Sequence, residues 1–182
     1  MSKKMMLLVG QSGAGKSTLA EDLEAKLGLK AIPSYCTRKP RYEGEKGHTF
    51  ITEEEFDELE NIVAFATTTK ARYAVTQDML DDEQYSVYVI DNSGIKFLQE
   101  HYKGEREFVI AYITAPLRER FERIVRRAAD TDDAVGFALE RVAHDAVEFR
   151  DVPYDIQIEN GNGNYNEALA ALCLFCQQQG VV

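Results

Sequence analysis

Hydrophobic runs mark the strands that the chain is expected to bury. Met5 to Val9 is continuously apolar, and Tyr85 to Ile90 and Phe108 to Ile113 are further strand-like runs. Such runs are typical of parallel strands that helices cover on both faces. Tyr154 to Ile158 alternates between apolar and polar residues instead, which indicates an edge strand. The pattern therefore predicts an α/β fold built on a parallel sheet.

Helical spacing and terminal signals place helices between these strands. The first helix carries leucines on one face (Leu19, Leu23 and Leu27) and stops near Gly28. Thr52 and Glu55 form a capping-box signature for a short helix. Pro116 is expected in the first turn of another helix, and Ala168 to Cys176 is expected to form the closing one.

Shorter strands are expected at Ala31 to Ile32, Ile62 to Ala66 and Tyr73 to Val75. With 182 residues, of which 45% are hydrophobic, the chain is long enough to bury a proper core. No internal repeat or linker divides it. We therefore expect a single domain that spans residues 1–182.

The charge balance limits the partners. The chain has 21 Lys and Arg against 31 Asp and Glu, a net charge of −10, which opposes non-specific binding to nucleic acid or to a membrane surface. No stretch approaches the roughly 20 apolar residues of a membrane-spanning helix. The apolar run after Lys4 is short and enters a glycine-rich loop directly, unlike a secretory signal. We expect a cytoplasmic protein without a membrane partner.

The segment from Gly10 to Ser17 carries the strongest chemical signal. It matches G-x-x-x-x-G-K-[ST] and lies between the first strand and the first helix. Its glycines let successive backbone N–H groups converge on an anion. Lys16 is placed to reach the β- and γ-phosphates of ATP, and the Ser17 hydroxyl can bind Mg²⁺. The predicted ATP-binding residues here are Gly10, Ser12, Gly13, Ala14, Gly15, Lys16, Ser17 and Thr18.

The loop from Ser34 to Arg41 is a second candidate anion site. Arg38 and Arg41 lie three residues apart among hydroxyl side chains and a proline. Guanidinium groups bind phosphate oxygens through paired, charge-assisted hydrogen bonds. On these residues alone, a second phosphate site and a solvated basic loop fit equally well.

With these motifs in this order, the chain resembles the guanylate kinases. The resemblance rests on Gly10 to Ser17, on Ser34 to Arg41 and on the turn from Glu43 to Phe50. It implies a P-loop NTPase fold, a parallel sheet flanked by helices with a small mixed-sheet acceptor-binding insert and a short lid. The implied core covers residues 1–33 and 86–182, the insert about 34–85 and the lid about 127–140.

The resemblance implies an enzyme that transfers phosphoryl groups from ATP to a nucleoside monophosphate, with GMP or dGMP as the first expectation. It also implies a monomer or a homodimer. In the family, residues that match Ser34, Arg38 and Arg41 hold the acceptor phosphate, which Tyr73 could also touch.

The acceptor pocket departs from the family pattern. His48 stands where the family usually has a tyrosine, Ala64 where a glutamate reads the base, and Val75 where a hydroxyl does. The candidates for a replacement hydroxyl are Thr67, Thr68 and Thr76.

Asp91 ends the strand from Tyr85 to Ile90, and two roles are open for it. A carboxylate at this end of a strand can organise Mg²⁺ near the P-loop. It can equally cap the helix that follows, and the two roles are compatible. In the family, the matching aspartate lies beside the acceptor nucleotide and the metal.

Five arginines occur in the ten residues from 118 to 127, and most are expected to face solvent. In the family, arginines that flank the lid close over the donor phosphates. The candidates for that catalytic role are Arg123, Arg126, Arg127 and Arg141, of which Arg141 matches best. Asn160 resembles the asparagine of the family's adenine-binding turn.

Other functions also fit the sequence. The changes at His48, Ala64 and Val75 suit a kinase of the same build that acts on a different or modified nucleotide. Guanylate kinase-like domains also occur as non-catalytic binding modules, and a P-loop could serve a simple ATPase switch. The intact Lys16–Ser17 pair, together with two basic-loop arginines, favours the kinase.

Overall fold

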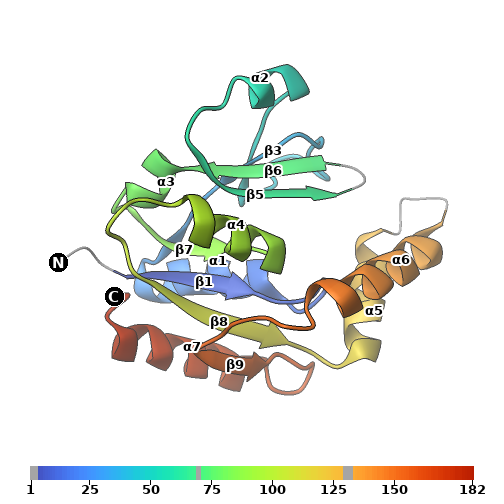
Figure 1. Ribbon diagram of the computed structural model, residues 1–182. Helices are drawn as coiled ribbons and strands as arrows, with labels where there is room; N and C mark the ends of the chain where they lie inside the picture. The colour runs from blue at the N-terminus through green and yellow to red at the C-terminus, as the bar shows by residue number, and fades with distance from the viewer. Residues whose placement is uncertain (1–3, 69–70, 129–132) are drawn as a thin grey trace.

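The computed structural model describes residues 4–68, 71–128 and 133–182. Within them, five strands form a central parallel sheet in the order β2-β7-β1-β8-β9 (Figure 1). β9 lies at an edge, as its alternating pattern predicts. The strands are β1 (Met5–Val9), β2 (Lys30–Ala31), β7 (Tyr85–Val89), β8 (Phe108–Thr114) and β9 (Ile156–Glu159).

Helices cover both faces of this sheet. On one face, α1 (Lys16–Leu27) and α7 (Tyr165–Gln179) pack in one apolar cluster with Leu8. On the other face, α4 (Asn92–His101) packs in a second cluster with Leu7. Because β1 is buried on both sides, it reads as a continuous apolar run.

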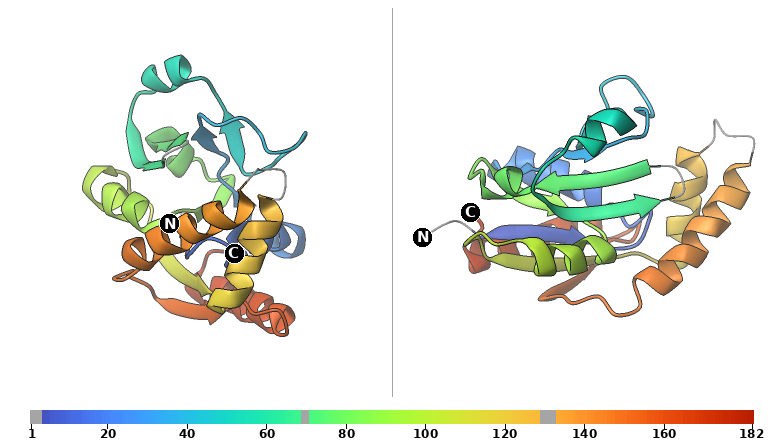
Figure 2. Two further views of the ribbon diagram at one scale, coloured as in Figure 1. Left: turned by 90° about the vertical axis from the view of Figure 1, so that its right-hand side faces the viewer. Right: turned by 45° about the horizontal axis from the view of Figure 1, so that its top comes forward.

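A second sheet of four strands lies beside α4 (Figures 1 and 2). One of its pairings is parallel and two are antiparallel, so the sheet is mixed. Val63 and Val75 bury their side chains in the same cluster as α4. The predicted α/β fold with a small mixed sheet is confirmed. The strands are β3 (Ser34–Cys36), β4 (His48–Phe50), β5 (Ile62–Thr68) and β6 (Ala71–Thr76), with α2 (Glu53–Asp57) and α3 (Gln77–Asp81).

Local signals explain several element ends. The Glu55 N–H donates to the Thr52 hydroxyl at 3.1 Å and the Thr52 N–H to the Glu55 carboxylate at 2.7 Å, so the capping box is confirmed. The second strand is Lys30–Ala31 and not Ala31–Ile32, although the Ile32 N–H still donates to Val87 of β7 at 2.9 Å. Pro116 is the N-cap of the next helix and lies just before its first turn.

The last two helices before β9 are α5 (Leu117–Arg127) and α6 (Ala134–Glu148). They pack against each other at the end of the sheet where β1 ends (Figure 1). Residues 129–132 of the expected lid lie outside the described residues. Among the described helices, none is long and apolar enough to cross a membrane.

Candidate functional site

The P-loop connects β1 to α1. A Cβ on Gly10 would lie 2.1 Å from the carbonyl oxygen of Ile113, and one on Gly13 would lie 2.6 Å from that of Arg120. Gly13 and Gly15 also have φ angles of 79° and 91°, which side chains with a Cβ rarely adopt. The loop therefore needs glycines to lie against β8 and α5. A backbone turned in this way forms a concave set of N–H groups that fits phosphate oxygens.

The ammonium group of Lys16 bends back over this loop. Its Nζ donates to the carbonyl oxygens of Gly10 at 2.5 Å and Gln11 at 3.2 Å. Burial lowers the pKa of Lys16 to about 8, although attraction to Asp145 acts in the opposite direction. Among the described residues, the hydrogen-bond partners of the ammonium are carbonyl oxygens, so it can exchange them for phosphate oxygens.

Ser17 and Asp91 are the predicted metal ligands. Ser17 is exposed in the first turn of α1. Asp91 caps α4, because its Oδ1 accepts hydrogen bonds from the Gly94 N–H at 2.7 Å and the Ser93 hydroxyl at 3.1 Å. Burial raises the pKa of Asp91. The described residues contain no group of three or more His, Cys, Asp or Glu side chains that could hold a metal. Two oxygen ligands suit Mg²⁺, which takes most of its ligands from phosphates and water.

The predicted acceptor residues gather on the second sheet. The Ser34 hydroxyl lies 3.0 Å from His48 Nδ1, and the rings of His48 and Tyr73 lie 5.5 Å apart. The Arg38 guanidinium lies 5.2 Å from the centre of the Phe50 ring. Burial lowers the pKa of His48 to about 4, and the charge of Arg38 adds to the shift. The imidazole is therefore neutral at pH 7.

Glu45 binds both arginines of this group, and the sequence analysis missed it. Arg38 donates to its two carboxylate oxygens at 2.8 and 2.6 Å. Arg41 donates from its backbone N–H at 2.7 Å and from Nη1 at 3.1 Å. Burial raises the pKa of Glu45, but the hydrogen bonds outweigh burial and hold the pKa at about 2. An acidic residue so close to both arginines in the sequence was the available signal.

A pocket of about 270 Å³ lies beside the P-loop, with Gly15, Thr18, Arg123 and Asn160 in its lining. Asn160 is buried, and its Nδ2 donates to the carbonyl oxygen of Ala14 at 2.8 Å. Arg123 donates to the carbonyl oxygens of Gly13 at 3.0 Å and of Asn160 at 3.1 Å. Arg123 therefore ties the P-loop to the chain after β9, so we assign it a structural role and not one at the donor phosphates.

Asn160→Asp is expected to lower the free energy of unfolding by about 1–3 kcal/mol, because a buried carbonyl would lose its donor. Weaker ATP binding should follow, since Asn160 supports the loop at Ala14. The matched control is Asn162→Asp, because the exposed Asn162 accepts from Arg123 at 2.8 Å and a carboxylate can do the same. Thermal unfolding and calorimetry measure both. Equal stability of the two variants would contradict the role of Asn160.

The candidate lid arginines differ in their exposure and in their contacts. Arg126 is exposed near the end of α5. Arg127 is also exposed, yet partial desolvation lowers its pKa, and the charges of Arg41 and Arg141 lower it further. Arg141 donates to the Ser12 hydroxyl from Nη2 at 2.8 Å and from Nε at 3.2 Å. Arg141 therefore lies against the P-loop.

The chain is similar to known proteins along most of its length. Guanylate kinases from two strains of Campylobacter jejuni are each 31% identical over 183 residues, which cover 93% of this chain and 87% or 86% of theirs. The chain belongs to the guanylate kinase family. A guanylate kinase structure from Anaplasma phagocytophilum has the same fold, with a TM-score of 0.62 and 23% identity over 98% of this chain and 87% of that one. No protein-family model matches the chain.

One protein similar to this chain is not named a guanylate kinase. The bifunctional ribose 1,5-bisphosphokinase-thymidine phosphorylase of Cupriavidus pinatubonensis is 28% identical over 164 residues. These residues cover 87% of this chain and 27% of that protein. Similarity to this chain therefore extends beyond proteins named guanylate kinase.

The positions where the resemblance predicts base-reading groups carry no polar side chain. Ala64 and Val75 pair across β5 and β6, and both are fully buried in the apolar core. The Thr68 hydroxyl bonds the backbone of Ala71 in the hairpin, and Thr76 precedes α3. The exposed Thr67 pairs with Arg72 near the hairpin end. The pair Ala64 and Val75 has no side-chain hydrogen-bonding group to offer a guanine.

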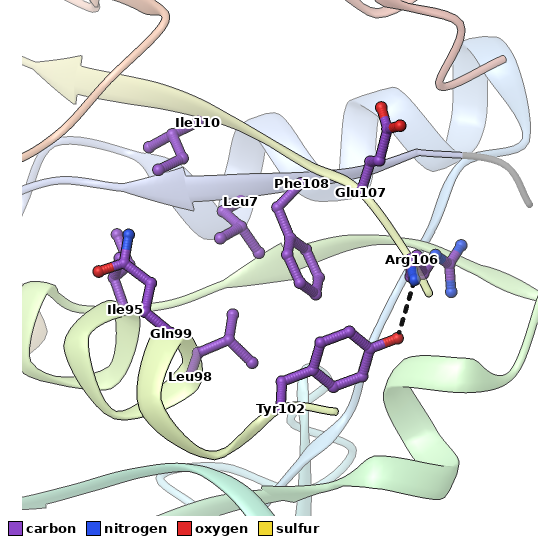
Figure 3. Close-up of a pocket in the computed structure, with 9 residues that line it drawn as sticks. All are labelled: Leu7, Ile95, Leu98, Gln99, Tyr102, Arg106, Glu107, Phe108 and Ile110. Atoms are coloured by element: carbon purple, nitrogen blue, oxygen red, sulfur yellow. Dashed lines mark hydrogen bonds between the residues drawn. The ribbon is translucent and has the colours of Figure 1, made fainter. Parts of the chain in front are cut away.

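A larger cavity, of about 450 Å³, lies away from the P-loop and from the predicted acceptor residues (Figure 3). Leu98 of α4 and Tyr102, which caps that helix, face Phe108 of β8 across it. The Tyr102 hydroxyl accepts from the Arg106 N–H at 3.2 Å and donates to Asp81 at 2.5 Å. Because its lining includes no P-loop or predicted acceptor residue, we assign this cavity no part in the reaction.

Proposed function

We propose that the protein transfers the γ-phosphoryl group of ATP to the phosphate of a nucleoside monophosphate, with GMP and dGMP as the first candidates. The observation that carries the proposal is the P-loop, with the Lys16 ammonium over it and the Arg141 guanidinium bound to its Ser12 hydroxyl. Arg127 supports the proposal, because the charges of Arg41 and Arg141 lower its pKa and its own charge lowers the pKa of Lys16.

The chain's own residues suit such a transfer. The acceptor phosphate is already a nucleophile, so the protein chiefly has to hold two anions in line and exclude water. The P-loop and Lys16 would hold the donor phosphates, and Ser34, Arg38 and Arg41 the acceptor phosphate. Mg²⁺ bound by Ser17 and Asp91 would neutralise charge on the donor. Arg127 and Arg141 would stabilise the charge on the phosphoryl group between the two sites.

A second candidate acceptor is a phosphomonoester that is not read through a guanine. The apolar pair Ala64 and Val75 supports it, because both side chains are buried in the core and offer no hydrogen bond that would select a guanine. The relative named ribose 1,5-bisphosphokinase-thymidine phosphorylase also supports it. A different or modified nucleotide and a sugar phosphate both belong to this class.

The test is ADP formation from Mg-ATP with a panel of ribo- and deoxyribonucleoside monophosphates and ribose phosphates. We expect turnover with GMP or dGMP. Turnover with another phosphomonoester alone would mean that this compound, and not a guanine nucleotide, is the acceptor. Acceptor-independent hydrolysis would indicate an ATPase switch, and no ADP formation a non-catalytic binding module. Either of these two results would overturn the kinase.

A further inference from the structure

Several charged side chains of helix α6 face the site, and several of its apolar side chains face solvent. Arg141, Asp145 and Glu148 bond the P-loop or the start of α4. Val135, Leu139 and Val147 are 52%, 57% and 70% exposed. Because an apolar face usually holds a helix in place, these polar contacts help to position α6.

Asp145 makes the most buried of these contacts. Its side chain is 0% exposed, and its Oδ2 accepts the backbone N–H of Ser12 at 2.6 Å. The other oxygen lies 4.0 Å from Arg141 Nη2 and 3.5 Å from His144 Nδ1, and accepts no hydrogen bond from the described residues. Burial lowers the pKa values of Lys16 and Arg120, and the charge of Asp145 opposes both shifts. The carboxylate thus interacts with several basic side chains.

Stability alone does not account for this arrangement. A buried ion pair seldom adds stability, because desolvation offsets the attraction, and an oxygen without a hydrogen bond adds a further cost. What the carboxylate does provide is geometry. Asp145 holds the main chain of Ser12, and the hydroxyl of Ser12 holds Arg141, so the two residues one turn apart on α6 bind a single loop residue.

We propose that Asp145 is a positioning residue that fixes Arg141 and the P-loop in one arrangement for phosphoryl transfer. The role rests on the proposed kinase function. Asp145 acts through Ser12 and Arg141, and not by a contact of its own with either substrate. The sequence signal is the spacing of four residues between Arg141 and Asp145, which places both on one helix face.

The first measurement needs no substrate. In the ligand-free protein, the short, charge-assisted bond places the Ser12 amide proton downfield in NMR spectra. In Asp145→Asn this signal is expected to move upfield, and the Arg141 Nε–H signal to broaden. The matched control is Glu140→Gln, which removes one charge from an exposed position of the same helix. It should leave both signals unchanged.

The second measurement is kinetic. Asp145→Asn is expected to lower kcat by about 10²-fold, the cost of a misplaced group. The KM for ATP should change by less than about threefold, because the ground state loses little. In the Arg141→Ala background, Asp145→Asn should have almost no further effect, since the residues act as a unit.

Three results would overturn the inference. Unchanged NMR signals and kcat would leave the kinase intact and Asp145 without a role. Fully additive losses in the double variant would mean that Asp145 does not act through Arg141. A wild-type chain and a Glu140→Gln control that transfer to no acceptor would remove the proposed function, and the positioning role with it.

Discussion

Lys16→Met is expected to lower kcat for phosphoryl transfer by about 10³-fold, the cost of losing one donor aimed at developing charge. Methionine has a similar length but no charge and no N–H group. Its hydrogen bonds to described residues go to the carbonyl oxygens of Gly10 and Gln11, so its loss should leave the fold intact. The measurement is steady-state kinetics with the acceptor found in the panel.

Lys26→Met is the matched control for Lys16→Met, because Lys26 lies exposed in the last turn of the same helix. It should retain wild-type kcat. A Lys16→Met variant with more than about a tenth of wild-type kcat would contradict the assignment of Lys16 to the transferring phosphoryl group.

A pH profile gives an independent measurement on Lys16. Burial lowers its pKa from 10.5 to about 8 in the ligand-free protein. Between these values the unfolded chain binds the proton that the folded chain releases, so stability rises with pH in that window. Phosphate favours the charged amine, so ATP affinity should fall above about pH 8, by up to tenfold per pH unit. Calorimetry should show that Lys16→Met lacks this dependence.

The fold could be predicted well because its signals are local. The apolar run from Met5 to Val9, the glycine spacing after it and the Thr52 capping box each depend on a few adjacent residues. The P-loop could likewise be predicted, because its three glycines and Lys16 all lie within residues 10–16. The short β2 was placed one residue late because its pairing with β7 depends on a partner far along the sequence.

The site could be predicted only where a motif carries it. Glu45 and Asp145 were missed because their importance lies in their partners. Asp145 is 133 positions from Ser12, so no window of sequence contains both. The resemblance placed Arg123 among the candidate lid arginines, yet its guanidinium bonds the carbonyl oxygens of Gly13 and Asn160. The sequence shows which residues are charged, but only the folded structure shows which groups each of them contacts.

Arg38→Ala is expected to raise the KM for the acceptor by about 10²-fold, within the range for truncating one partner of a buried charge pair. Arg38 makes a two-pronged bond to Glu45, whose side chain is 4% exposed, so its guanidinium is fixed before any phosphate arrives. The KM for ATP should remain unchanged, because the P-loop is untouched. Steady-state kinetics with each substrate varied in turn measures both values.

Arg72→Ala is the matched control for Arg38→Ala. Arg72 is an arginine of the same sheet and also forms ion pairs, but with Glu53 and Asp57 of α2, and its guanidinium lies 4.3 Å from the centre of the Phe56 ring. Its loss should change neither KM. If Arg38→Ala left the acceptor KM at the wild-type value, the loop from Ser34 to Arg41 would be a solvated basic loop and not a phosphate site. If both variants raised it equally, the effect would come from the stability of the sheet and not from a phosphate contact.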